Sequence, residues 1–316
     1  MELHNFTELN KILIKRVMKT IKSFVLLALL FTGAVLNAQK PITITEDSVL
    51  FKGTSYPGLV VTIPEVNYET VQKNWMKELQ SGTKSKVVTE NQEMTIFGAN
   101  IKDISPNPVN IYSKFTSHDS LLLLIVTIEL EKDKYIEKAN GENEVTHAKT
   151  FLKKFAKDQY VDRVEDEVKS ENKILKDLES ELESLKNKKL HLQKSIQSNR
   201  TDSIQATDNI KILNDQIAGL SQEIMDQNKQ LISIQPGAVK DEKTDYIKTI
   251  EKKKKKIYNE VESLENKISK LHSENEQFSD EIVKNESDQE TLKGKITQQQ
   301  LVVQKFEEKL KTVKGF

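Results

Sequence analysis

The sequence predicts an α+β protein in which a small two-layer α/β head is followed by a long antiparallel α-helical coiled-coil hairpin. Three features of the 316-residue chain support this fold class. Apolar residues recur every seven positions from Val161 to Val313, a Pro-Gly pair divides this run into two blocks, and apolar residues alternate with polar ones between Lys40 and about Leu130. Heptad spacing is typical of coiled coils and alternation is typical of strands.

The chain begins with the features of a secretory signal peptide. Two lysines precede an apolar run at 24–36, which ends close to the small residue Ala38. This order predicts a signal peptide at residues 1–38 that is cleaved after Ala38, and therefore an exported protein, periplasmic or secreted. The apolar run is shorter than the about 20 residues of a transmembrane helix, and an uncleaved anchor is the alternative. Met18 fits the start of a signal peptide better than the first residue, which favours a mis-assigned start for residues 1–17.

The α/β head is expected at residues 39–145. Its strands are indicated by short apolar or alternating runs bounded by turn residues. These runs lie at 42–51, 58–63, 94–101, 109–115 and 121–128. The last run is apolar except for Thr127, which is typical of a strand covered on both faces.

Two helices are expected to cover this sheet. In the first, Asn67 caps the N-terminus, Val71, Trp75 and Leu79 lie four apart on one face, and the helix ends near Gly82. The second begins near Glu144 and continues without a breaker, so residues 146–234 are predicted to lead into the first coiled-coil arm. The head is just large enough to bury its own core.

The long heptad seam requires a partner helix. No residue is inserted or skipped in the first block, so its apolar seam has a period of 3.5 and faces one partner along a left-handed supercoil. A helix of this length extends about 110 Å, which is deeper than any globular core. The second block, at 244–316, supplies a partner within the same chain. Pro236 and Gly237 are expected to end the first helix inside a hairpin turn at 235–243.

Folding the second arm back so that Ile234 meets Ile247 predicts which residues pair in the core. Several pairs near the turn are apolar on both sides: Ile224 with Ile257, Leu220 with Val261, Ile217 with Leu264, and Leu213 with Ile268. A parallel homodimer would place Lys189 against Lys189, which favours the hairpin. Two hairpins are still able to associate into a four-helix bundle.

The middle of the arm is predicted to be its weakest part, because each layer there combines a polar with an apolar residue. These layers are Asn199 with Ile282, Ile196 with Asn285, Leu192 with Gln289, and Lys189 with Leu292. An unpaired buried amide costs about 1–3 kcal/mol. The region is therefore expected either to be locally dynamic or to recruit another protein or a second copy.

Part of the head resembles a known class of domain. The segment Val60–Pro64, the helix with Trp75, and the segment Met94–Gly98 resemble small exported bacterial domains of unknown function with a TATA-box-binding-protein-like fold. The resemblance covers residues 40–130 and depends on the order of elements. It implies no catalytic residues, and DNA binding does not follow from a fold name.

Composition and motifs exclude several functions. Acidic and basic residues balance at 48 each, and Arg163 and Arg200 are the only arginines after the signal, so a nucleic-acid partner is not expected. There is no cysteine, no HExxH pair, and no GxSxG, Walker or GxGxxG loop, so we expect no enzyme activity, no metal site and no cofactor. We also expect no membrane contact beyond the signal peptide.

Two function classes remain. The first is a structural or adaptor protein of the cell envelope, which uses the coiled-coil hairpin for spacing or for protein–protein interaction. The second is a chaperone-like or transport-adaptor protein, because a signal peptide, a small β-containing body and helical tentacles are similar to periplasmic holdase chaperones and to prefoldin. The balanced charge departs from the strong field of one sign that is expected of a holdase. In either class the expected partners are envelope proteins or a second copy.

Overall fold

The computed structural model describes residues 41–118, 121–139, 141–233 and 238–316. The expected signal peptide at 1–38, Pro236 and Gly237 lie outside the described residues. The chain divides into two compact units, of which the first reaches Arg163 and the second is Val164–Gly315. The first unit contains a β-sheet and the second is a helical hairpin, so the α+β fold class predicted from the sequence is confirmed.

The first unit is built on one antiparallel sheet of seven strands. The path through the sheet is β1-β2-β6-β5-β4-β3, and β7 pairs with β6. The strands are β1 (Ile44–Phe51), β2 (Thr54–Pro64), β3 (Val88–Glu90), β4 (Glu93–Ala99), β5 (Val109–His118), β6 (Leu121–Glu131) and β7 (Lys134–Tyr135). The long strand β6 lies between β2 and β5 and is therefore the centre of the sheet.

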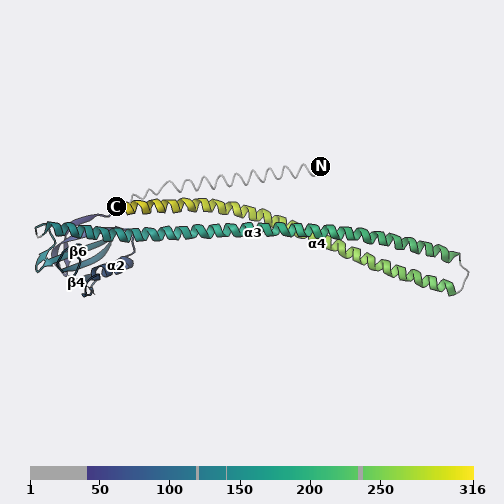
Figure 1. Ribbon diagram of the computed structural model, residues 1–316, viewed down its shortest axis with the longest axis horizontal. Helices are drawn as coiled ribbons and strands as arrows, with labels where there is room; N and C mark the ends of the chain where they lie inside the picture. The colour runs from purple at the N-terminus through teal and green to yellow at the C-terminus, as the bar shows by residue number, and fades with distance from the viewer. Residues whose placement is uncertain (1–40, 119–120, 140, 234–237) are drawn as a thin grey trace. The chain divides into compact units, whose positions relative to one another are not determined.

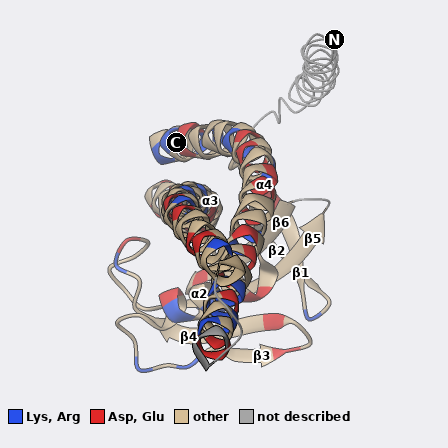
Figure 2. Cartoon of the chain, turned by 90° about the vertical axis from the view of Figure 1, so that its right-hand side faces the viewer, with Lys and Arg blue, Asp and Glu red and all other residues tan. Residues whose placement is uncertain are grey.

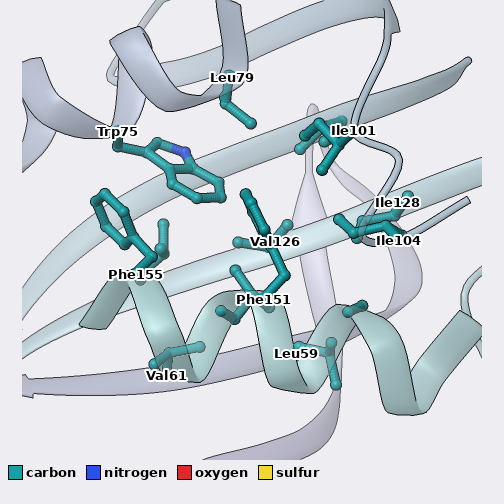
Figure 3. Packing of buried hydrophobic residues seen from close by; sticks show 14 of the residues in the cluster. Leu59, Val61, Trp75, Leu79, Ile101, Ile104, Val126, Ile128, Phe151 and Phe155 are labelled. Atoms are coloured by element: carbon teal, nitrogen blue, oxygen red, sulfur yellow. The ribbon is translucent and has the colours of Figure 1, made fainter. Parts of the chain in front are cut away.

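One face of the sheet is covered by α2 (Tyr68–Gln80) and by the beginning of α3 (Glu142–Ile232). Helix α2 begins as expected, since the side chain of Asn67 accepts a hydrogen bond from the backbone N–H of Thr70. Trp75 of α2 lies against Phe155 of α3, with ring centroids 4.9 Å apart. Figure 3 shows the Trp75 ring directed toward Val126 of the sheet, with the Phe155 ring beside it.

The sheet differs from the expectation in two respects. Strands β3 and β7 were not expected, because they contain only three and two residues and lack a run of alternating apolar residues. In β6, which the sequence predicts to be covered on both faces, burial alternates: Leu122, Leu124 and Val126 are buried, whereas Leu123 and Ile125 are only half-buried. Helices therefore cover one face of β6 more fully than the other.

The second unit is an antiparallel pair of helices. The rest of α3 runs out to Ile232, and α4 (Ala238–Gly315) returns alongside it, as Figure 1 shows. Helix α4 begins at Ala238, inside the segment 235–243 that the sequence assigned to the turn. Nothing in residues 238–243 opposes a helix, because this segment contains no proline or glycine, and α4 therefore starts close to the end of α3.

Candidate interaction surfaces of the hairpin and the head

The seam of the hairpin is the apolar surface by which α3 and α4 recognise each other. Ile217, Ile257 and Val261 form its buried centre near the turn, and Ile210, Leu213 and Leu220 pack against them. The other expected core residues, Ile224, Leu264 and Ile268, are half-buried. All eight residues predicted for the core are therefore at least half-buried, and the heptad assignment places them on the seam.

The pairing across this seam differs from the predicted register. The hydroxyl of Tyr246 donates a hydrogen bond to Glu223 over 2.5 Å. The predicted register would instead place Glu223 opposite Tyr258, about 18 Å further along the axis. Moving α4 by one heptad away from the turn sets Ile217 beside Ile257, in agreement with the buried cluster. The predicted register is therefore wrong by one heptad, because α4 starts before the end of the expected turn.

The corrected register brings polar residues together in the middle of the arm. The ammonium of Lys189 lies 2.7 Å from the carboxylate of Glu286, and the amide of Asn199 donates to Glu274 over 3.2 Å. The expectation that Lys189 faces Leu292 is therefore not met. Polar residues share layers in this register. Registers shifted by one heptad are disfavoured, since they would again set polar against apolar groups.

Two of the predicted polar core residues are deeply buried. Asn285 is 4% exposed and Gln289 is 9% exposed, and the side-chain amide of Gln289 donates to that of Asn285 over 2.7 Å. Among the described residues, the Nδ2 atom of Asn285 has no hydrogen-bond partner, and neither has the Oδ1 atom of Asn275. Both atoms lie in the middle of the arm, where an unsatisfied buried amide lowers stability.

A second polar section, which was not predicted as a site, joins the beginning of the second unit to the end of α4. Gln299 donates to the Glu171 carboxylate over 2.7 Å, and Lys309 lies 3.3 Å from Glu167. Glu171 and Gln299 both occupy seam positions in the heptad pattern, so the sequence already indicated that both face the other helix. The one-heptad error in register concealed that they meet.

The face of the head sheet opposite α2 carries a group of aromatic rings. Tyr56 lies 4.6 Å from Tyr135 between ring centroids and stacks on Tyr112 at 6.5 Å. Phe97, which is 57% exposed, meets Tyr112 edge to face at 6.1 Å. Burial, followed by the negative charge of Glu129, raises the pKa of Tyr135 to about 12.

Charged side chains frame these rings. Glu129 accepts hydrogen bonds from Asn110 over 2.8 Å and from the hydroxyl of Tyr112 over 3.4 Å. On the other side of Tyr112, the ammonium of Lys114 lies 3.7 Å from Glu93 and 5.1 Å from the ring centre of Phe51. The arrangement provides flat apolar surface with a polar border, which is typical of a protein-binding surface.

A shallow hollow of about 370 Å³ lies between α2 and α3 within the first unit. Its lining combines Lys77 and Lys154 with the carboxylates of Glu78, Asp103 and Asp158. With Asp162, which also lines the hollow, four carboxylates stand against two lysines, so the lining carries an excess of negative charge. Among the described residues, no group of three or more metal-ligating side chains is placed to hold a metal ion.

Comparison with known proteins adds no family. A scan against protein-family models finds no match, and neither does a search of curated proteins. Within the described ranges, none of the helices is both long and apolar enough to cross a membrane.

Proposed function

We propose that this protein is an exported structural or adaptor protein of the cell envelope, in which the coiled-coil hairpin provides spacing and binds protein partners. The hairpin carries the proposal. Its two helices run antiparallel over Val164–Gly315, and their seam is already filled by each other. Binding of a further protein must therefore use the outer faces of the helices or the head.

The chemistry of these surfaces fits protein partners. Figure 2 shows acidic and basic residues mixed along both helices, and no single sign of charge dominates. Mixed charge suits selective contacts between proteins and does not suit the phosphates of nucleic acid or an anionic membrane. The proposal includes no catalytic activity and no cofactor, and export rests on the expected signal peptide at 1–38.

In vivo photo-crosslinking in the complete protein tests the proposal. A photoreactive residue at Phe97 probes the aromatic face of the head, and one at Val283, which is 67% exposed, probes the outside of α4. We expect discrete crosslinks to envelope proteins from at least one position, and an N-terminus at Gln39 in the exported fraction. Retention of the protein in the cytoplasm would overturn the proposal, and so would the absence of crosslinks from several outer positions.

The alternative is a chaperone-like or transport-adaptor role. The observation that favours it is the exposure of apolar side chains toward the far end of α3, where Met225 is 48% exposed and Ile232 is 87% exposed. A holdase would suppress thermal aggregation of an unfolded client protein at equimolar ratio and would lose this ability on Met225→Lys, Ile232→Lys substitution. The adaptor role predicts no such suppression.

A further inference from the structure

One outer face of α3 changes character halfway along the second unit. The face lies beside the seam and is formed by residues at alternating intervals of four and three, beginning 165, 169, 172 and 176. From 165 to 186 its seven positions include six charged residues. From 190 to 232 its thirteen positions include only two charged residues, Arg200 and Lys211. We name this second part, residues 190–232 at these positions, the neutral face.

The neutral face is open and carries large apolar groups. Leu190 is 50% exposed, Ile204 63%, Met225 48% and Ile232 87%. Depletion of charge together with exposed apolar side chains distinguishes the centre of a protein interface from ordinary surface. Because the spacing repeats every seven residues over about 40 Å, from Ile204 to Ile232, the shape fits another helix lying along α3.

We propose that the neutral face binds the same face of a second copy of this chain, antiparallel, about a twofold axis near Ala218. This inference rests on the proposed function and deepens it by naming a partner. A twofold interface must complement itself, because each residue before the axis meets one after it. Ile204 and Ile232 are equally distant from Ala218, and so are Lys211 and Met225.

The charged residues beside the neutral face favour the antiparallel orientation of the two copies. Asp208 and Lys229 lie next to the neutral face at nearly equal distances from Ala218. An antiparallel pair sets each Asp208 against Lys229 of the second copy. It also sets Lys211 against the uncharged Met225 of the second copy. A parallel pair would set Lys211 against Lys211, a repulsive layer in the middle of the face. Complementarity therefore requires a second copy in the antiparallel direction.

Sedimentation velocity of the complete mature protein over a range of concentrations tests this pairing. We expect a monomer–dimer equilibrium that is weakened about tenfold or more by Ile204→Lys, Met225→Lys, with helix content unchanged. The matched control is Ile212→Lys, Val283→Lys, which alters side chains that are 56% and 67% exposed on other faces. A chain that stays monomeric throughout overturns the inference, and so does equal weakening by the control pair.

Charge reversal and crosslinking test the orientation. Asp208→Lys should weaken the dimer, and adding Lys229→Asp should restore it. The chain has no cysteine, so Ala218→Cys should be joined to its own copy by a short bismaleimide. Ile204→Cys should not be joined, because its copy lies about 40 Å away. Equal linking of both variants would show a parallel pair and overturn the inference. A monomer that still crosslinks envelope proteins would refute this inference alone, whereas a dimer without envelope partners would refute the proposed function alone.

Discussion

At the scale of single residues, the clearest dependence in the head is the hydrogen bond from the indole of Trp75 to the hydroxyl of Ser113, 2.9 Å long and fully buried. Ser113→Ala leaves the indole N–H without an acceptor away from water. We expect the free energy of unfolding of the head to fall by about 1–3 kcal/mol. Trp75 is the single tryptophan of the chain, so its fluorescence during urea unfolding reports the change directly.

The matched control for Ser113→Ala is Thr116→Ala, on the same strand but exposed. It removes a hydroxyl that water replaces, and the urea midpoint should stay within error of the wild type. Equal midpoints for both variants would show that the buried hydrogen bond contributes nothing to stability.

Tyr135 makes the head sensitive to alkali. Its pKa is raised to about 12 in the folded state by burial and by Glu129, whereas the unfolded value is about 10. The contribution of the Tyr135 proton to the free energy of unfolding is therefore fully present below pH about 10. It is lost as the pH rises toward 12, because the unfolded chain releases this proton first. Tyr135→Phe should flatten the decline in urea midpoint between these pH values, and Tyr258→Phe in the hairpin should not.

At the scale of elements, the register of α3 against α4 has a direct test. Leu213 packs against the buried cluster that contains Val261, and the corrected register sets these two residues opposite each other, whereas the predicted register set Leu213 against Ile268. The two positions on α4 differ by about 10 Å along the axis, and a disulfide tolerates Cα separations only up to about 7 Å. Leu213→Cys, Val261→Cys should form an intramolecular disulfide rapidly. Faster closure of Leu213→Cys, Ile268→Cys would restore the predicted register.

The buried amides of Asn285 and Gln289 lower stability while they fix the register. Replacing both by leucine removes an unsatisfied Nδ2 atom together with the amide that donates to Asn285. Such paired replacement is often neutral or stabilising. We expect the thermal midpoint of the hairpin, followed by circular dichroism, to rise. We also expect the Leu213→Cys, Ile268→Cys pair to close faster in this background. Asn266→Leu, at an exposed position of α4, should change neither the thermal midpoint nor the rate of disulfide closure.

Some of these features can be predicted from the sequence and others cannot, for physical reasons. A heptad pattern determines which face of a helix is buried, and the eight residues expected in the core of the hairpin are buried or half-buried. Register depends on where the turn closes and on which polar groups meet, and one heptad of slip preserves the apolar pattern. Strand β3 left no signal, because all three of its residues are exposed, and the contact of Glu171 with Gln299 depends on the register. The aromatic face was missed because Tyr56, Tyr112 and Tyr135 come from three separate strands.

At the scale of the whole molecule, the two units share one helix but bury separate cores. Phe151 and Phe155 of α3 belong to the core of the head, while Ile217 of the same helix belongs to the hairpin. Each core is formed by its own side chains. A substitution that destabilises one core therefore need not change the free energy of unfolding of the other. Helix α3 continues across the boundary at Arg163, and it is the covalent route by which the units could unfold together.

Two probes separate these outcomes in the complete protein. Tryptophan fluorescence follows the head, and far-ultraviolet circular dichroism follows mainly the hairpin, which holds most of the helical residues. We expect two distinct urea transitions: Ser113→Ala should move only the fluorescence midpoint, and Asn285→Leu, Gln289→Leu only the dichroism midpoint. If every variant shifted both midpoints equally, α3 would couple the units into one cooperative structure. Variants made in the head would then also weaken the arm, and head and arm would not act as independent binding modules.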